Sequence, residues 1–230
     1  MNDIAVVLSA GTGKRFGSVS PKQFIMLRSK PVLYYSLKNF QGSNFVSSIV
    51  VVSNRDFYNK TKLVSSAFNK VCAVIEGGAR RQDSVWNALD WIKRNVGEDC
   101  RSVFIHDAAR PLFNAVLLQR LHTASLTHPA VIPVVPLEDT VKTINGSMVG
   151  LTLNRSEIFR VQTPQVFNFG MLYRAYASFP EGMDATDDAS VVEKSGHAIY
   201  TVQGERENMK ITYPVDLKIA EGIIESTIEV

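Results

Sequence analysis

A glycine-rich basic turn follows the first apolar segment of the chain. Residues 8–22 read Leu-Ser-Ala-Gly-Thr-Gly-Lys-Arg-Phe-Gly-Ser-Val-Ser-Pro-Lys and continue the strand-like run of residues 4–8. Gly11 and Gly13 allow a close backbone approach that a side chain would forbid, so successive amide groups can point at phosphate oxygens. The basic residues in and just after the turn are Lys14, Arg15 and Lys22. The turn predicts a phosphate-binding loop, although a plain strand-to-helix connection with solvated basic residues would have the same composition.

The turn fits neither of two standard nucleotide motifs. Residues 11–17 read Gly-x-Gly-x-x-x-Gly, one position longer than the dinucleotide fingerprint. Lys14 is followed by Arg15, where a P-loop carries Ser or Thr. Basic residues inside and after such a turn suit a triphosphate whose α-phosphorus is attacked while diphosphate leaves.

Polar residues follow two of the later strand-like segments. Asp107 is a hard oxygen ligand suited to Mg²⁺, which binds through one or two carboxylates plus substrate phosphates. An ion pair between Asp107 and Arg110 is the alternative. Gly77-Gly78 would let the backbone pass close to a flat ligand, and the Ser84 hydroxyl could then contact a base edge. Alternatively, the two glycines form a turn, and Asp83 or Ser84 caps the next helix.

The histidines and cysteines predict no metal site. His106, His122, His128 and His197 share no metal-ligand spacing and pair with no visible nucleophile, so a hydrolytic triad is not expected. His106 adjoins Asp107 but should point to the opposite side of the strand, and we interpret it as structural. Cys72 and Cys100 lie far apart beside apolar sequence and are expected to be buried free thiols.

Apolar segments of strand length alternate with longer segments of helical period. The strand-like segments, rich in Val and Ile, are residues 4–8, 48–53, 71–76, 102–106 and 130–135. The helical segments between them are residues 31–41, 56–68, 82–94 and 114–127. In one of these, Val85, Leu89 and Ile92 recur at helical spacing and predict a stripe that faces the core. Further along, helices are expected at 169–179, 187–195 and 214–227, and a strand at 198–203.

This alternation predicts an α/β fold with a mainly parallel, twisted sheet and helices over both faces. No linker or internal repeat divides the sequence, so residues 1–230 are expected to form a single domain. Ligands of such sheets bind outside the carboxyl ends of the strands. The segments expected to meet there are residues 9–22, 77–84, 106–111 and 138–140.

The regular alternation lapses after Pro136. Residues 137–160 contain two short β-prone pieces around Asn145-Gly146-Ser147, and Asn-Gly is a strong signal for a two-residue hairpin turn. A hairpin inserted here should project from the sheet as an arm. Pattern alone leaves open whether the arm covers a site, holds another subunit or is an ordinary surface hairpin.

Composition excludes several classes of protein. The chain of 230 residues is 45% hydrophobic and 20% charged, as in globular proteins with a substantial core. Its net charge of +3 comes from 25 basic and 22 acidic residues without long basic runs, which argues against nucleic-acid binding and favours small anionic ligands. No apolar run approaches the ~20 residues that span a bilayer. The first strand begins within a few residues of the amino terminus, so no signal segment and a cytoplasmic location are expected.

Seven motifs, taken in order, point to one enzyme family. They are Ser9–Arg15, Pro21-Lys22-Gln23, Gly77-Gly78 with Arg81 and Asp83-Ser84-Val85, His106–Pro111, Thr163-Pro164-Gln165, Thr186–Ser190 and Asn208–Thr212. From end to end the chain resembles 2-C-methyl-D-erythritol 4-phosphate cytidylyltransferases of non-mevalonate isoprenoid synthesis. The resemblance implies a single Rossmann-like nucleotidyltransferase domain in which the substrate phosphate attacks the α-phosphate of CTP and pyrophosphate departs.

The resemblance also implies roles for individual residues. Arg15 and Lys22 would stabilise the charge that grows on the α-phosphate. Arg155 and Lys210 would hold the attacking phosphate in line, and Asp107 would bind Mg²⁺. The nucleotide site would comprise Ser9, Ala10, Gly11, Gly13, Gly78, Ser84 and Ala108. The methylerythritol phosphate side would be lined by Arg110, Thr140 and Thr163.

The same resemblance assigns the arm a purpose. The family's hairpin crosses to a second subunit, so residues 137–160 would build a homodimer, with Thr140 and Arg155 acting in trans. One departure is Arg80, because the family often carries an acidic or small polar residue at that position.

Two other functions remain to be distinguished from this one. Cytidylyltransferases for ribitol 5-phosphate share the fold, the basic turn and the late lysine, but Ala109 and the segment 186–190 look more like the methylerythritol enzyme. A non-catalytic nucleotide sensor would not need Arg15, Lys22, Asp107, Arg155 and Lys210 together, since a binder has no use for cations on both the leaving and the attacking sides.

The Lys22→Ala variant tests whether this lysine acts in the chemical step. We expect the catalytic rate to fall by orders of magnitude while nucleotide affinity changes much less, because the charge that Lys22 would stabilise grows only in the transition state. Pyrophosphate release and CTP binding are to be measured on the same preparation. An unchanged rate would remove Lys22 from the mechanism.

Overall fold

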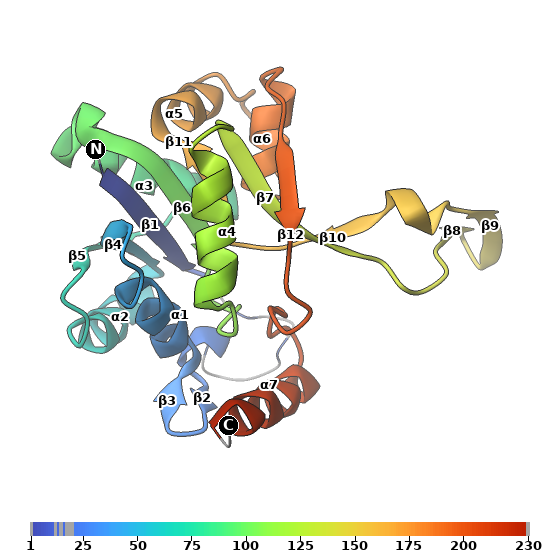
Figure 1. The fold of residues 1–230 in the computed structure, drawn as a ribbon, viewed down its shortest axis with the longest axis horizontal. Helices are drawn as coiled ribbons and strands as arrows, with labels where there is room; N and C mark the ends of the chain where they lie inside the picture. The colour runs from blue at the N-terminus through green and yellow to red at the C-terminus, as the bar shows by residue number, and fades with distance from the viewer. Residues whose placement is uncertain (1, 12, 14–15, 17–20, 229–230) are drawn as a thin grey trace.

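The computed structural model describes residues 2–11, 13, 16 and 21–228. Its central element is an eight-stranded sheet with the order β10-β7-β11-β6-β1-β4-β5, in which β12 also pairs with β7 (Figure 1). The strands are β1 (Asn2–Ser9), β4 (Val46–Ser53), β5 (Val71–Glu76), β6 (Cys100–Asp107), β7 (Ala130–Pro136), β10 (Phe159–Val161), β11 (Gln165–Asn168) and β12 (Tyr200–Gln203).

Side chains of β1 alternate between two hydrophobic cores, one on each face of the sheet. Ile4 and Val6 pack on the face covered by α3 (Arg81–Asn95), α5 (Phe169–Ala177) and α6 (Asp188–Lys194). Ala5 and Val7 pack on the opposite face, with α1 (Val32–Gln41), α2 (Tyr58–Ser65) and α4 (Ala115–Ser125). A central strand buried on both faces explains why the sequence of β1 is almost uninterruptedly apolar.

A third, smaller cluster lies below the carboxyl ends of the strands. It joins the short hairpin of β2 (Met26–Leu27) and β3 (Lys30–Pro31) to α7 (Pro214–Ile228). Leu27, Val32, Ile211 and Ala220 are its buried members. This cluster holds the segment before α7, which carries Lys210, against the first third of the chain.

The predicted strands and helices are present, and the sheet is mainly parallel. The pairs β1–β4, β1–β6, β4–β5 and β7–β12 are parallel, whereas β10 and β11 are antiparallel to their neighbours. The predicted stripe of α3 is buried, with Val85, Leu89 and Ile92 fully inaccessible. The sequence did not predict β11, a strand too short to show a period, although it lies between β6 and β7 in the middle of the sheet.

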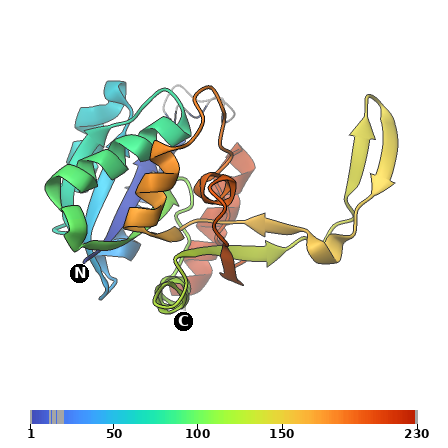
Figure 2. The ribbon, with the colours of Figure 1, turned by 90° about the horizontal axis from the view of Figure 1, so that it is seen from above.

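The predicted hairpin is present and projects from the body of the protein (Figure 2). Strands β8 (Lys142–Asn145) and β9 (Met148–Thr152) form it, and a short 3-10 turn over Arg155–Glu157 follows. The connecting residues are Gly146-Ser147 rather than Asn145-Gly146, because Asn145 already pairs with Met148. Gly146 has a φ of 58°, a left-handed conformation that suits glycine.

Two further expectations have mixed outcomes. Cys100 is a buried free thiol as expected, but Cys72 is exposed, so the expectation of two buried thiols was wrong for Cys72. Among the described residues, no helix is both long enough and apolar enough to cross a membrane. The cytoplasmic location stays a prediction.

Candidate functional site

Two cavities open at the carboxyl ends of the strands and share part of their walls. The first, of about 400 Å³, lies between the end of β1, the loop before α3 and residues 107–109. The second, of about 560 Å³, lies between β6, the chain from Val161 to Gln165 and the start of α6. Residues common to both walls are Arg81, Asp107 and Lys210. The two cavities therefore meet at one charged group.

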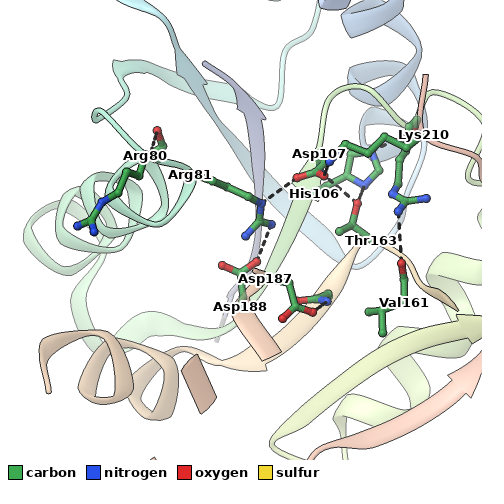
Figure 3. A network of polar contacts seen from close by, with 12 residues as sticks. Arg80, Arg81, His106, Asp107, Val161, Thr163, Asp187, Asp188 and Lys210 are labelled. Carbon is green, nitrogen blue, oxygen red and sulfur yellow. Dashed lines mark hydrogen bonds and ion pairs between the residues drawn. The ribbon is translucent and has the colours of Figure 1, made fainter. Parts of the chain in front are cut away.

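Asp107 is bonded to both of the shared cations (Figure 3). Its Oδ1 accepts a hydrogen bond from Arg81 Nε at 3.1 Å, and its Oδ2 accepts one from Lys210 Nζ at 2.6 Å. Burial alone would raise the pKa of Asp107, but the charges of Arg81 and Lys210 outweigh burial and hold that pKa far below its usual range. The carboxylate at the junction is therefore ionised.

Arg110 is not the partner of Asp107, contrary to the alternative drawn from the sequence. Its guanidinium donates instead to the backbone carbonyls of Asn208 at 2.9 Å and Val161 at 3.3 Å. Burial lowers the pKa of Arg110, and its Nε is buried with no hydrogen-bond partner in the described structure. Arg110 lines the second cavity. A cation with an unsatisfied donor beside a cavity is suited to an anionic ligand.

Arg81 is fixed from its other side by a buried carboxylate. Its Nη2 lies 2.8 Å from Oδ2 of Asp188, a fully buried residue whose Oδ1 accepts the hydroxyl of Tyr176 at 2.6 Å. Burial lowers the pKa of Arg81, but Asp188 and Asp107 together raise it well above its usual value. Burial and the charge of Asp188 raise the pKa of Tyr176. The sequence motifs contained Arg81 and Asp188, but spacing gave no sign that they would pair.

Close packing of the loop before α3 explains why Gly77 and Gly78 are glycines. A Cβ on Gly77 would lie 2.7 Å from Ala10 Cβ, and one on Gly78 would lie 2.3 Å from Asp83 Cβ, distances that real Cβ atoms do not reach. Ser84 Oγ accepts the Gly78 N–H at 3.1 Å and donates to the Arg80 carbonyl at 3.1 Å. Asp83 accepts the Arg80 N–H at 3.0 Å, so Asp83 rather than Ser84 caps the helix.

Arg80 ties this loop to the chain before α6. Its guanidinium pairs with Asp83 at 2.9 Å and with Asp184 at 3.2 Å. Gln82 adds a second link, donating to the Met183 carbonyl at 2.8 Å and accepting the Ala185 N–H at 2.7 Å. The loop that lines the first cavity is thereby joined to the segment that leads into the wall of the second.

The loop after β1 is held by Gln23, a residue of the Pro21-Lys22-Gln23 motif for which the sequence predicted no role. Gln23 Nε2 donates to the carbonyls of Ser9 at 2.7 Å and Gly11 at 2.9 Å. Predicted nucleotide-site residues that line the first cavity are Ala10, Gly11, Gly13, Gly78, Ser84 and Ala108, and the predicted catalytic residue Lys22 lines it too. Ser9 is buried behind this wall and does not line it. Arg15 lies outside the described residues.

Thr163, which was predicted to line the acceptor side, lies on the wall of the second cavity. Its Oγ1 accepts the Asp107 N–H at 3.1 Å and lies 3.1 Å from Nδ1 of His106. His106 is completely buried, and burial lowers its pKa to about 3. His106 is thus an uncharged interior residue, consistent with its structural interpretation.

Thr140 and Arg155 lie on the arm and line neither cavity of the same chain. Arg155 Nη1 donates to the Glu138 carbonyl at 2.6 Å, and its side chain is exposed. Within one chain, Lys22 and Lys210 share the first cavity's wall with Asp107, and Arg110, Thr163 and Lys210 share the second cavity's wall with it, but these two arm residues line neither.

Among the residues that the structure describes, Asp107 is also the only carboxylate shared by the two cavity walls. Within the described ranges, no three His, Cys, Asp or Glu residues are grouped closely enough to bind a metal by themselves. One ionised carboxylate between two cavities does fit Mg²⁺, which completes its shell with water and substrate phosphates.

Replacing Asp188 by Asn tests whether the buried pair with Arg81 supports this site. We expect the free energy of unfolding to fall by about 3–5 kcal/mol, because the Arg81 charge would lose its buried partner. The matched control is Asp90→Asn, which breaks the exposed pair with Arg94 and should change the unfolding free energy by no more than ~0.5 kcal/mol. Denaturant unfolding measures both. Equally small losses of unfolding free energy in both variants would show that the Arg81–Asp188 pair does not stabilise the fold.

Comparison with known proteins shows the family to which the chain is similar. The family model "IspD: 2-C-methyl-D-erythritol 4-phosphate cytidylyltransferase" matches residues 4–226. The chain is 40% identical over 225 residues to the protein of that name from Caldicellulosiruptor bescii, covering 98% of each chain. It is 41% identical over 227 residues to that of Lachnoclostridium phytofermentans, covering 96% of this chain and 95% of the relative.

Solved structures of similar proteins have the same fold. A crystal structure of a 4-diphosphocytidyl-2C-methyl-D-erythritol synthase superposes with a TM-score of 0.83 at 30% identity, over 97% of this chain and 99% of the other. The 2-C-methyl-D-erythritol 4-phosphate cytidylyltransferase of Thermus thermophilus gives a TM-score of 0.79 at 29% identity, over 96% and 98%. The chain belongs to the 2-C-methyl-D-erythritol 4-phosphate cytidylyltransferase family.

Proposed function

We propose that the protein transfers the cytidylyl group of CTP to 2-C-methyl-D-erythritol 4-phosphate, giving 4-diphosphocytidyl-2-C-methyl-D-erythritol and pyrophosphate. The observation that carries this proposal is the group of Arg81, Asp107 and Lys210, which forms part of the walls of both cavities. A reaction that joins two phosphates needs two anionic ligands to meet beside fixed cations, and the cations Arg81 and Lys210 lie where the two cavities meet.

In the reaction, an oxygen of the acceptor phosphate forms a bond to the α-phosphorus of CTP. The bond from that phosphorus to the bridging oxygen of the β-phosphate breaks, and its electron pair leaves with pyrophosphate. Negative charge increases around the α-phosphorus, so fixed cations directed at it lower the barrier. Lys22, on the wall of the first cavity, has this role together with Arg15.

Lys210 holds the attacking phosphate. Its ammonium reaches Asp107 at the point where the second cavity joins the first. Two anions repel each other in solution, and a cation between them offsets that repulsion while it fixes the line of attack. Arg155 supplies a second such cation from the arm.

The first cavity takes CTP. Ala10, Gly78 and Ala108 offer backbone and small side chains to the base, and Ser84 adds a hydroxyl whose position is fixed by Gly78 and Arg80. Gly77 and Gly78 tolerate no Cβ because this loop packs closely on Ala10 and Asp83. A narrow wall of backbone and small side chains would suit a pyrimidine better than a purine.

The second cavity takes the acceptor. Arg110, with its unsatisfied buried Nε, and Lys210 are the cations available to the acceptor phosphate. Thr163 and the start of α6 supply hydroxyl, amide and carboxylate groups suited to a polyol, and Thr140 contributes from the arm.

Asp107 would hold Mg²⁺ together with the phosphates of CTP. When bound there, the ion neutralises phosphate charge and polarises the phosphoryl oxygens. The charges of Arg81 and Lys210 keep the Asp107 carboxylate ionised and so ready to act as a ligand.

A homodimer completes the site in this proposal. The 230 residues act as one cytidylyltransferase domain, and the arm of residues 137–160 reaches the neighbouring subunit. Since Thr140 and Arg155 line neither cavity of their own chain, a partner's cavities are where they can act. No feature of the described structure favours ribitol 5-phosphate as the acceptor.

The direct test is turnover with defined substrates. Pyrophosphate release is measured with CTP, Mg²⁺ and either 2-C-methyl-D-erythritol 4-phosphate or ribitol 5-phosphate, with ATP, GTP and UTP as nucleotide controls. We expect turnover with CTP and the methylerythritol phosphate. Preferential turnover of ribitol 5-phosphate would change the acceptor, and CTP binding without pyrophosphate release would indicate a nucleotide sensor.

Mixing two inactive variants tests the arm in trans. Arg155→Ala and Lys210→Ala homodimers should each be nearly inactive, but a randomised mixture should recover about a quarter of wild-type activity, because half the dimers then carry one intact site. Arg155→Ala mixed with Thr140→Ala is the matched control and should recover nothing, since both changes lie on the arm. Failure of the first mixture, with heterodimers shown to form, would place Arg155 in cis or outside the mechanism.

A further inference from the structure

The His106 ring is held in one orientation by the core. It is completely buried and packs against Phe113, with ring centroids 4.3 Å apart, and edge-on against Phe40, at 5.6 Å. Both ring nitrogens face polar groups of the second cavity's wall or its supports. The ring therefore cannot turn over without breaking two hydrogen bonds in a site that excludes water.

The partner of Nε2 determines which nitrogen carries the proton. Nε2 lies 3.1 Å from the Arg110 carbonyl, which can only accept, so Nε2 must donate. Ser36 Oγ, 3.4 Å from the same nitrogen, gives its own proton to the Ala108 carbonyl at 3.3 Å and is also an acceptor here. The ring is completely buried and neither nitrogen is bonded to a carboxylate, so it is uncharged and Nδ1 has no hydrogen.

The bare Nδ1 in turn fixes the hydroxyl of Thr163. At 3.1 Å, Nδ1 accepts the one proton that Thr163 Oγ1 can donate. The same oxygen accepts the Asp107 N–H at 3.1 Å. Thr163 thus has no proton left for a ligand, and one lone pair remains.

We propose that His106 is a positioning residue that makes Thr163 a hydrogen-bond acceptor only, so that Thr163 recognises a hydroxyl group of the polyol acceptor and not its phosphate. The inference rests on the proposed function and assigns the phosphate and the hydroxyl groups of the acceptor to different residues of the second cavity. Arg110 and Lys210, which can only donate, take the phosphate, whereas Thr163, which can only accept, takes an alcohol O–H.

The same ring also supports the phosphate side of the cavity. Through Nε2, His106 fixes the backbone of Arg110, and through Nδ1 it fixes Thr163, whose hydroxyl holds the backbone of Asp107. The single imidazole of His106 therefore sets the relative positions of Arg110, which binds phosphate, of the Thr163 hydroxyl, which accepts a hydrogen bond from the polyol, and of the Asp107 carboxylate.

The tautomer can be tested without any activity. Nitrogen-15 NMR of the histidine rings at neutral pH, with the His106 signals assigned by their loss in His106→Gln, should show a proton on Nε2 and none on Nδ1. A proton on Nδ1 would overturn the proposal, whatever the enzyme's substrate.

Substrate analogues test whether Thr163 accepts or donates a hydrogen bond. In each analogue of the polyol phosphate, one hydroxyl is replaced by hydrogen or by fluorine, since fluorine cannot donate a hydrogen bond. In the wild type, the deoxy and fluoro analogues at one position should both lose about tenfold in kcat/KM relative to the parent acceptor. In Thr163→Val, the ratio of kcat/KM for the parent acceptor to kcat/KM for each analogue should be near one, although the overall rate is lower. Thr127→Val, at an exposed threonine just after α4, is the matched control and should leave the ratio unchanged.

Two outcomes of this series would overturn the proposal. A fluoro analogue that behaves like the parent would show that Thr163 donates, and a Thr163→Val penalty equal for every analogue would show that Thr163 contacts no hydroxyl. If the wild type does not turn over the parent acceptor with CTP, the proposed function fails instead, and the NMR result still decides the role of His106.

Two isosteres of His106 separate positioning from simple structural support. An Asn amide oxygen can replace Nδ1 as the acceptor for Thr163, whereas a Gln amide reaches the place of Nε2 and leaves Thr163 free to donate. His106→Asn should therefore keep the parent-to-fluoro ratio near its wild-type value, and His106→Gln should reduce it toward one, with the KM for CTP little changed in both. Equal ratios in two folded variants, checked by thermal unfolding, would reduce His106 to a packing role.

Discussion

The Asp107 carboxylate, shared between Arg81 and Lys210, is the interaction around which both cavities are built. Each of these charges would be costly to bury alone, and together with Asp188 they satisfy one another. The members come from the end of β6, the start of α3, the start of α6 and the segment before α7. No two neighbouring elements could assemble this group, so it exists only when the sheet, the helical layer that contains α3 and α6, and the α7 cluster are in place.

The four charges of the group around Asp107 cancel, so the site needs other cations to bind phosphates. Asp107 and Asp188 balance Arg81 and Lys210, so the group alone offers no net attraction to a phosphate. Binding two phosphorylated ligands therefore requires further positive charge near the junction. In the proposed mechanism, Lys22 on one side and Arg110 on the other would provide it, and a divalent cation at Asp107 would release Lys210 from its pairing with that carboxylate.

Local pattern predicted the layers of this fold and much of the site, because both depend on features that are close together in sequence. The stripe of Val85 and Leu89, the glycines before α3 and the carboxylate at the end of β6 all lie where the sequence indicates. The partners of Asp107 could not be predicted in this way. Arg110 is nearest in sequence, but topology sets the contacts, and Lys210 is 103 positions away. The short antiparallel strand β11, which follows Thr163, was missed because its four residues are too few to show a period.

The arm adds an energetic argument for a second subunit. A lone two-stranded hairpin is at best marginally stable in water, because it has no layer against which to bury its side chains. In β8 and β9 the large apolar residues remain more than half exposed, with Ile144 at 63%, Met148 at 71% and Leu151 at 74%. Burying such side chains on another surface contributes about 25 cal/mol for each Å² of apolar area removed from water. In the proposed homodimer, a second copy of this chain would supply that surface, and the contact that stabilises the arm would also deliver Arg155 to the acceptor phosphate.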